Sequence, residues 1–427
     1  MNIAILGAGA RGANVYGNIF SRMSGVEISA VCDTDGTKAN NAKRQFNVPE
    51  NACFLDEDNF FAAGRLADGL VIATMDQDHY RQVMKALDAG YKKILLEKPV
   101  SNSRSEVNEI ARRAKESGTD ILVCHVLRYT AFYQTVKNVI RGGAIGDVTV
   151  INHQENVGYW HFAHSFTRGN WRNEETSAPI LLAKTCHDFD LLYWFADSKC
   201  TEIKSFAALS HFRSENAPEG CAKRCLNSDA AYRKSLIGLG PVRITGGACK
   251  YIDVCPFGVK KLYIDKNAPF NWGDLHAVGK NHPTVSEKVD AFKNPQNPYG
   301  RCVYFCDNDV YDHQSVVMKF ASGATASLTL TAFSKDCYRR IHITGSKGEL
   351  FGNDNQGFLT LNVFGGKTKK IRVGGGLGGH LGGDNGICDT FVKLLSGEKI
   401  HSDFLTTIDV TAESHNMIFD AEETGRS

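Results

Sequence analysis

Apolar and polar residues recur in the first third of the chain at spacings that predict strands and helices in turn. Asn2 to Leu6 is a short apolar run, and helical spacing then places Val15, Ile19 and Met23 on one face. Further strands are expected at 26–32, 70–74, 93–96 and 120–124, and further helices at 35–46, 80–89 and 103–117. Strands alternating with helices of this length predict a parallel, doubly wound sheet over residues 1–124.

The pattern changes after Cys124. A helix at 128–141 and a strand at 147–156 are expected, and residues 315–330 alternate around Gly323 as a hairpin does. More strands are expected near 340–343, 349–351 and 359–364. Residues 125–427 are therefore predicted to form an α+β domain dominated by a sheet, with an insertion at about 211–310 that lacks clear periodicity.

Composition narrows the possible functions of a chain of 427 residues. The net charge of +2 and the 22% of charged residues give no basic field for nucleic acid or an anionic membrane. The chain enters a strand at once, and no apolar run is long enough to span a membrane, so a cytoplasmic protein with a small-molecule partner is expected. Thirteen scattered cysteines indicate reduced thiols rather than a disulfide framework.

A GxGxxG motif follows the first strand and opens the first helix. Glycine is needed there because a pyrophosphate must approach the backbone closely, and the helix N-terminus then holds the phosphates. Asp33 ends the second strand about 20 residues further on, as the full dinucleotide-binding fingerprint requires. Its carboxylate would bind the adenosine ribose and repel a 2′-phosphate, which favours NAD over NADP, although Arg11 in the loop could still contact a phosphate.

Other residues at the carboxyl ends of the strands belong to the same site, because ligands of such sheets bind there. The candidate cofactor-binding residues are Gly7, Gly9, Ala10, Arg11, Gly12, Asp33, Thr74, His79, Glu97 and Lys98.

Three features together resemble the Gfo/Idh/MocA family of NAD(P)-dependent sugar and inositol oxidoreductases. They are the glycine motif, Glu97-Lys98-Pro99 after the fourth strand, and His187-Asp188 ahead of an apolar run. The resemblance implies a Rossmann domain followed by a domain with an open, largely antiparallel sheet, with the substrate between them. It also implies a homodimer or homotetramer built on the open sheet face.

The resemblance places Lys98 and His187 in the catalytic site. His187 fits a general base without adjustment of its pKa, and Lys98 would stabilise a developing alkoxide. The family's dehydrogenases often have an aspartate four residues before that histidine, where this chain has Ala183 beside Lys184. Two activities therefore stay open: an NAD-dependent oxidoreductase acting on a sugar, sugar derivative or cyclitol, and an NAD-dependent glycoside hydrolase that oxidises, eliminates, hydrates and reduces again.

The stretch 155–172 is dense in aromatic, imidazole and arginine side chains without a helical or strand period. Carbohydrate sites use such mixtures, with aromatic faces stacking on the ring and polar groups reading hydroxyls; a loop packing its aromatics on the core is the alternative. The candidate substrate residues are Glu155, Tyr159, His161, His164, Arg168, Trp171, Lys184 and Asp188.

Two further stretches suggest specific roles. Cys221, Cys225, Cys249 and Cys255 lie in the insertion and could close a structural zinc site, with Cys302 and Cys306 as an alternative pair. Neither spacing is CxxC, so buried thiols without metal are the other interpretation. The glycine-rich stretch 374–384 could be a lid or a surface loop, with Asp384 capping the next helix.

Overall fold

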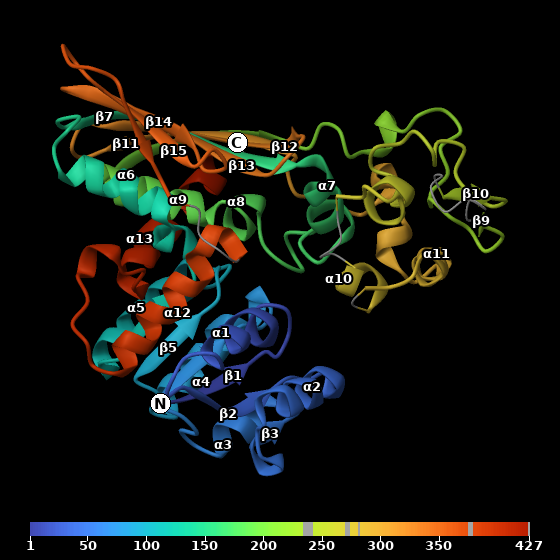
Figure 1. Ribbon diagram of the computed structural model, residues 1–427, viewed down its shortest axis with the longest axis horizontal. Coiled ribbons are helices and arrows are strands. Elements are labelled where there is room, and N and C mark those ends of the chain that lie inside the picture. The colour runs from blue at the N-terminus through green and yellow to red at the C-terminus, as the bar shows by residue number, and fades with distance from the viewer. Residues whose placement is uncertain (234–241, 270–273, 281, 375–378, 426–427) are drawn as a thin grey trace.

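The computed structural model describes residues 1–233, 242–269, 274–280, 282–374 and 379–425. Two sheets dominate these residues, one near each end of the view in Figure 1. No helix among them is long and apolar enough to cross a membrane.

The first sheet has six parallel strands in the order β3-β2-β1-β4-β5-β6. The predicted doubly wound fold of the N-terminal domain is confirmed. The strands are β1 (Asn2–Leu6), β2 (Glu27–Cys32), β3 (Cys53–Phe54), β4 (Gly69–Ile72), β5 (Lys93–Leu96) and β6 (Asp120–Val123). The helices are α1 (Asn18–Phe20), α2 (Gly36–Phe46), α3 (Glu57–Ala62), α4 (His79–Asp88) and α5 (Arg104–Ser117).

Helix α5 illustrates how the sequence fixes these elements. Val107, Ile110 and Ala114 are spaced for one face and are buried against the sheet. Gly118 ends the helix in the left-handed conformation, with φ of 61°. The first helix departs from the regular form, because a π-helical turn over Gly12–Gly17 precedes the short α1.

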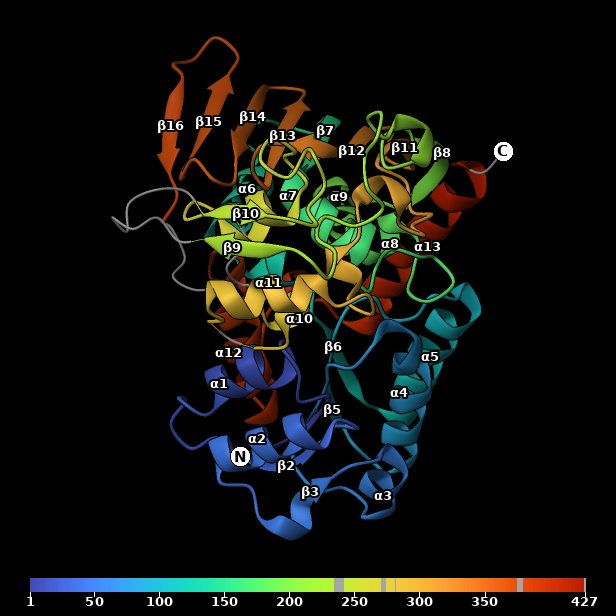
Figure 2. The ribbon, with the colours of Figure 1, turned by 90° about the vertical axis from the view of Figure 1, so that its right-hand side faces the viewer.

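The second sheet has eight strands in the order β16-β15-β14-β13-β7-β12-β11-β8. Only the β7–β12 pair is parallel within it, so the predicted largely antiparallel sheet is confirmed. Figure 2 shows the strands side by side at the top of the molecule. They are β7 (Val148–Gly158), β8 (Cys200–Ala208), β11 (His313–Phe320), β12 (Thr325–Ser334), β13 (Tyr338–Gly345), β14 (Gly348–Asn353), β15 (Phe358–Val363) and β16 (Lys369–Arg372).

One face of this sheet is covered and the other is open. Along β11, exposed and buried residues alternate through all eight positions, as they do in a strand with one solvated face. Between β6 and β8 the chain forms the helices α6 (Ala131–Arg141), α7 (Tyr159–Phe162), α8 (Ile180–Ala183) and α9 (Cys186–Ala196). Phe206 and Val317 are among the apolar side chains left exposed on β8 and β11.

The insertion lies to the right of the second sheet in Figure 1. It contains the two-stranded pair β9 (Ala231–Arg233) and β10 (Arg243–Thr245), a π-helical turn over Lys260–Ile264, and the helices α10 (Asp274–Val278) and α11 (Val285–Lys293). A capping box between Thr284 and Glu287 starts α11. Its elements are short, which agrees with the weak periodicity of this stretch.

The end of the chain returns to the N-terminal domain. Helices α12 (Gly383–Leu395) and α13 (Ile408–Gly425) lie beside α5 and β5 in Figure 1. Phe391 of α12 packs in the core on one side of the first sheet, and Ile408 and Ala412 of α13 pack in the core on the other. Two ion pairs join Arg104 of α5 to Asp420 and Glu423 of α13. The residues that complete the N-terminal core therefore extend far beyond residue 124.

Candidate functional site

The glycine loop has the shape that a dinucleotide requires. Gly7 has φ of +93°, and a Cβ there would lie 2.5 Å from the Ala73 carbonyl oxygen. A Cβ on Gly12 would lie 1.9 Å from the Gly7 carbonyl oxygen, so only glycine allows the helix to start against the strand. A Cβ on Gly9 would meet nothing within 4 Å, which leaves the backbone open to an approaching phosphate.

Asp33 stands at the carboxyl end of β2 and holds the same loop. Its Oδ2 accepts a hydrogen bond from the Ala8 backbone N–H (2.8 Å), and its Oδ1 accepts one from the Asp35 N–H (2.9 Å). The side chain is half-buried, and each carboxylate oxygen keeps a lone pair for a further donor. This arrangement fits recognition of the two ribose hydroxyls beside the loop.

Arg11 belongs to a buried ionic cluster. Its Nε donates to Glu97 Oε1 (2.6 Å) and its Nη2 to Asp384 Oδ1 (2.8 Å). The Tyr16 hydroxyl also donates to Glu97 Oε1 (2.5 Å). Burial alone would raise the pKa of Glu97, but the positive charges of Arg11 and Lys98 outweigh it, so that the pKa is lowered. The guanidinium faces these carboxylates, which makes Arg11 a brace between the loop and α12.

Asp384 corrects one expectation from the sequence. The residue at the N-cap of α12 is Gly382, and Asp384 lies inside the first turn without capping it. Its carboxylate instead binds Arg11 and, at 3.0 Å, His380 Nδ1. Residues 375–378 of the glycine-rich stretch fall outside the described residues, so a lid there stays a prediction.

Thr74 and His79 lie at the carboxyl end of β4. The Thr74 hydroxyl donates to Gln82 Oε1 (2.5 Å). His79 is fully buried, and its Nδ1 lies 2.7 Å from the Pro99 carbonyl oxygen. His79 thereby ties the start of α4 to the residue after Lys98.

Lys98 and His187 come together from different domains. The Lys98 Nζ donates to the backbone carbonyl of Ala183 (2.7 Å), four residues before His187. His187 lies in the first turn of α9, and its Nδ1 is buried without a hydrogen-bond partner among the described residues. Burial lowers the pKa of His187 well below its usual value, and the positive charges around it, Lys98 among them, lower it further. The expectation that the pKa of His187 needs no adjustment is therefore wrong, and the imidazole is neutral at neutral pH.

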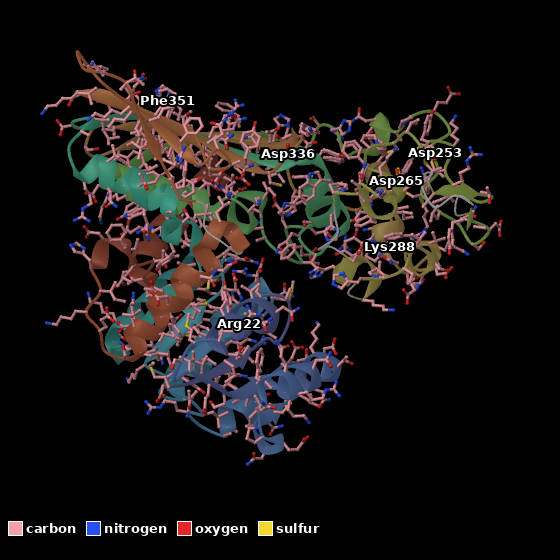
Figure 3. The ribbon with its side chains drawn as sticks, in the orientation of Figure 1. Arg22, Asp253, Asp265, Lys288, Asp336 and Phe351 are labelled. Carbon is pink, nitrogen blue, oxygen red and sulfur yellow. The ribbon has the colours of Figure 1, made fainter. Side chains whose placement is uncertain are left out.

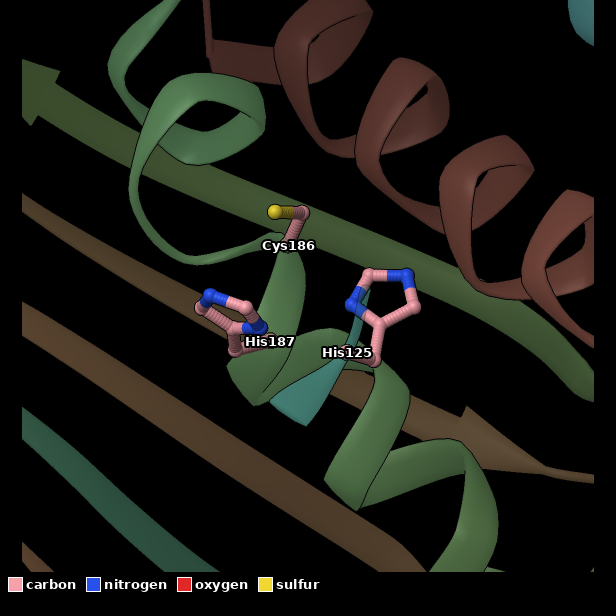
Figure 4. A group of neighbouring side chains, drawn as sticks. All are labelled: His125, Cys186 and His187. Carbon is pink, nitrogen blue, oxygen red and sulfur yellow. The ribbon is translucent and has the colours of Figure 1, made fainter. Parts of the chain in front are cut away.

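Figure 4 shows His187 beside Cys186 and His125. The rings of His125 and His187 are 5.5 Å apart and nearly perpendicular, and the three side chains could offer metal ligands within 4.8 Å of one another. The positive charge of Lys98 acts on all three groups and would oppose a divalent cation. We therefore interpret this cluster as part of an acid–base site.

A network of charges lies on the second sheet next to this site. The Arg339 Nε is 2.7 Å from Asp188 Oδ1 and 2.9 Å from Glu155 Oε2, and the Lys184 Nζ is 3.2 Å from Glu155 Oε1. Burial raises the pKa of Glu155 despite the two cations. Burial would also raise the pKa of Asp188, but Arg339 and the hydrogen bond to His153 hold it well below its usual range. The network combines acceptors and donors as hydroxyl recognition requires.

The stretch 155–172, predicted to bind substrate, contacts two different parts of the molecule. The Trp171 Nε1 donates to Asp76 Oδ2 (3.2 Å), which connects the two domains, and His161 lies near Lys184 and Lys98, whose charges help to lower its pKa. Arg168 is fully buried among residues of the insertion, and the His164 Nδ1 lies 2.7 Å from the Tyr263 hydroxyl. The structure thus places the side chains of His164 and Arg168 against residues of the insertion.

Tyr159, the remaining candidate of that segment, begins α7. Its ring is half-buried and meets Phe257 of the insertion edge to face, with 6.0 Å between the ring centres. It stays a predicted substrate contact.

Three residues of the site were not predicted. His125 directly follows the end of the fifth predicted strand, so its position at the carboxyl edge of the sheet was a usable signal. Arg339 comes from β13 and His380 from the glycine-rich stretch, with the His380 ring 6.3 Å from that of His187. No local pattern in the sequence connects these two residues with the site.

The fold and the glycine loop define a class, the dinucleotide-binding proteins, and comparison with known proteins narrows it. A family model described as "Oxidoreductase family, NAD-binding Rossmann fold" matches residues 1–125, and one described as "GFO/IDH/MocA C-terminal domain" matches residues 133–223. The chain belongs to the Gfo/Idh/MocA family of oxidoreductases.

Named relatives include two inositol 2-dehydrogenases. Inositol 2-dehydrogenase 2 of Mycolicibacterium vanbaalenii is 30% identical over 298 residues, which cover 65% of this chain and 79% of the relative. Inositol 2-dehydrogenase of Corynebacterium glutamicum (strain R) is 26% identical over 210 residues, which cover 48% of this chain and only 56% of the relative.

Solved structures agree on the fold. Levoglucosan dehydrogenase, in a complex with NADH and levoglucosan, matches with a TM-score of 0.67 over 100% of this chain and 97% of that chain, at 14% identity. At this identity the likeness concerns the fold alone.

Proposed function

We propose that this protein transfers a hydride between NAD and a hydroxyl-bearing carbon of a sugar, sugar derivative or cyclitol. The observation that carries the proposal is the pair Lys98 and His187, a buried neutral imidazole and an ammonium group brought together at the carboxyl edge of the cofactor sheet. The names of the dehydrogenase relatives supply the substrate class. The glycosidase alternative receives no specific support from them.

The residues divide the chemistry between them. Bound NAD supplies the acceptor for the hydride that leaves the carbon. His187 takes the hydroxyl proton onto a ring nitrogen, and the Lys98 ammonium group stabilises the negative charge that develops on the oxygen. The Ala183 carbonyl holds Lys98 in place where relatives often have an aspartate nearby, so orientation of the lysine does not require that side chain.

NAD is the proposed cofactor in preference to NADP. Asp33 presents a carboxylate where the adenosine ribose would bind, and a 2′-phosphate there would meet its negative charge. Arg11, the cation nearest in sequence, is engaged with Glu97 and Asp384. Glu97 is proposed to act on the cofactor site by holding the Arg11 side chain of the glycine loop.

The substrate hydroxyls are proposed to meet side chains of both the charge network and the aromatic segment. Glu155, Lys184 and Asp188 with Arg339 offer donors and acceptors on the second sheet. Tyr159, His161 and Trp171 form the proposed aromatic side. His164 and Arg168 are proposed to support this aromatic side by anchoring the same segment in the insertion.

A substrate screen tests the proposal directly. Purified protein is mixed with NAD and a panel of cyclitols, sugars and sugar acids, and NADH formation is followed by its absorbance. Stoichiometric NADH with at least one of these, abolished by His187→Asn and retained in the exposed-histidine control His313→Asn, supports it. Cleavage of nitrophenyl glycosides without NADH accumulation would instead establish the glycosidase mechanism, and NAD binding with neither activity would contradict both.

A homodimer or homotetramer is proposed as the working state. The open face of the second sheet exposes Phe206 and Val317, with 76% and 54% of their surface accessible, on neighbouring strands. Light scattering should give a multiple of the 46.9 kDa chain mass, and Phe206→Lys with Val317→Lys should lower it. A monomeric wild-type protein would contradict this proposal.

A further inference from the structure

Five cysteines from three separate segments line one cavity in the insertion. The cavity has a volume of about 220 Å³, and its thiols belong to Cys221, Cys225, Cys249, Cys255 and Cys302. Backbone hydrogen bonds hold the segments in register: the Cys249 N–H donates to the Cys225 carbonyl and the Cys302 N–H to the Lys223 carbonyl, each at 3.0 Å. The thiols are therefore brought together by the fold of the insertion itself.

Two of the sulfur pairs already have the separation expected for ligands of one metal ion. The Cys221 Sγ lies 3.5 Å from the Cys302 Sγ and 3.9 Å from the Cys249 Sγ. A tetrahedral zinc ion with Zn–S bonds of about 2.3 Å places its sulfur ligands about 3.8 Å apart. A cluster of iron and sulfide would hold the cysteine sulfurs farther apart than one metal ion does.

A buried cation beside the thiols lacks an anion. Arg168 is fully buried, and its side chain donates to the carbonyl oxygens of Arg301 and Phe257. Its Nη2 lies 4.0 Å from the Cys225 Sγ, whereas its Nη1 has no hydrogen-bond partner in the part of the chain that the structure describes. An uncompensated buried charge is costly, so an anionic centre is expected next to Arg168.

Three carboxylates of the insertion are paired with lysines. Asp253 and Asp265 pair with Lys260 at 2.9 Å and 3.3 Å, and Asp274 pairs with Lys288 at 2.9 Å. Figure 3 labels Asp253, Asp265 and Lys288 on this part of the molecule. The groups whose negative charge would act on Arg168 are the thiols of Cys225, Cys302 and Cys306 and the hydroxyl of Tyr263.

We propose that Cys221, Cys249, Cys302 and Cys225 bind a structural zinc ion, and that Arg168 balances one of the two negative charges of this centre. Four thiols lose their protons to solvent as one Zn²⁺ binds, so the centre carries two negative charges and no electron is transferred. Cys225 is assigned as the fourth ligand because it is buried and its Sγ lies 4.0 Å from the Arg168 Nη2. Relative to the sequence-based set, Cys302 replaces Cys255.

The centre would stabilise the wall of the proposed substrate site. The insertion has only short helices and strands, and a metal ion supplies the rigidity that a small core lacks. Arg168 and His164 carry this rigidity into the segment that begins at Tyr159, because both side chains are anchored in the insertion. Zinc is thus inferred to act on substrate binding through structure, without contact with reacting atoms.

Metal analysis of the wild-type protein tests the proposal first. Protein purified under reducing conditions without chelator should contain about one zinc per chain, and cobalt substitution should give the charge-transfer and d–d bands of a tetrahedral thiolate site. Absence of zinc together with no uptake on zinc titration would overturn the proposal. So would iron with acid-labile sulfide, or an intact mass lowered by the two hydrogens of a Cys221–Cys302 disulfide.

Variants then identify the ligands independently of enzymatic activity. Cys302→Ser and Cys225→Ser should each lose most of the bound zinc, whereas Cys255→Ser and the matched control Cys200→Ser on β8 should keep it. Full zinc content in Cys302→Ser, or loss in Cys255→Ser, would refute the assignment. If a ligand variant does not fold, the cobalt spectrum and zinc content of the wild-type protein still decide whether the centre exists. Zinc with no oxidoreductase activity would leave this inference standing and count against the proposed function alone.

Discussion

Replacing Lys98 and His187 singly and together is the most informative perturbation of the proposed mechanism. Loss of a general base typically costs 10²–10⁴-fold in rate, which corresponds to about 2.7–5.4 kcal/mol of transition-state stabilisation. His187→Ala should lower kcat within that range. Lys98→Met should be at least as damaging, because it keeps the stem that packs under Ala183 but removes the charge aimed at the developing oxyanion.

The double variant decides whether the two groups serve one step. If they do, its loss of kcat should be far smaller than the product of the two single losses. Rates are measured on the identified substrate at saturating NAD, with NAD affinity from calorimetry and folding from circular dichroism as controls. Near-wild-type turnover in either single variant would refute the reasoning, and so would fully multiplicative effects. The two groups are expected to act together because the charge of Lys98 adds to burial in lowering the pKa of His187.

Three further predictions address the cofactor, the core and the pH response. Asp33→Asn should weaken NAD by about 10- to 150-fold, from the loss of about 1.5–3 kcal/mol of hydrogen bonding to a charged group, but should not weaken NADP, as calorimetry would detect. Asp190→Asn leaves the buried Arg128 without its anion and should lower the free energy of unfolding in urea by about 3–5 kcal/mol. Burial lowers the pKa of His125 and His415 to about 3. The unfolded chain therefore binds protons first, and stability should fall as pH drops from about 6.5 towards 3, by about 1.4 kcal/mol per pH unit for each histidine. Thermal melts at stepped pH measure this loss.

Two of these predictions have a control on the surface. Lys319→Met removes one partner of an exposed ion pair with Glu202 and should leave the urea midpoint unchanged. His313→Asn should keep the acid sensitivity of the wild type, because that side chain is about half-exposed. Equal loss of NAD and NADP in the Asp33 variant would show that the glycine loop, rather than the ribose contact, had been disturbed.

Local patterns in the sequence were sufficient for the cofactor half of the molecule. Strand β5 matches its predicted bounds at 93–96. Lys98 comes directly after it and lies at the cofactor edge, because parallel strands bring their carboxyl ends to one edge of the sheet. The second sheet was predictable as a class, since alternation along β11 specifies one buried face. Its strand order was not, because β7 pairs with β12 and β13, more than 160 residues later, and pairing over such distances leaves no local trace.

Site residues failed to be predicted for a related reason. Arg168 and His164 have the side chains of a carbohydrate site, but composition does not say which way a side chain points, and both turn into the insertion. Arg339 completes the charge network from a strand whose sequence gives no sign of its neighbours. Cys302 meets Cys221 across a long stretch of chain, so spacing alone favoured the nearer Cys255.

The return of α12 and α13 to the cofactor sheet sets the order in which this protein can mature during synthesis. The sheet needs Phe391 on one side and Ile408 and Ala412 on the other to close its cores. Its strands leave the ribosome first, but they must wait, with apolar faces uncovered, until nearly the whole chain has emerged. We expect chains that stop before residue 383 to keep these apolar faces exposed, and therefore to be prone to aggregation.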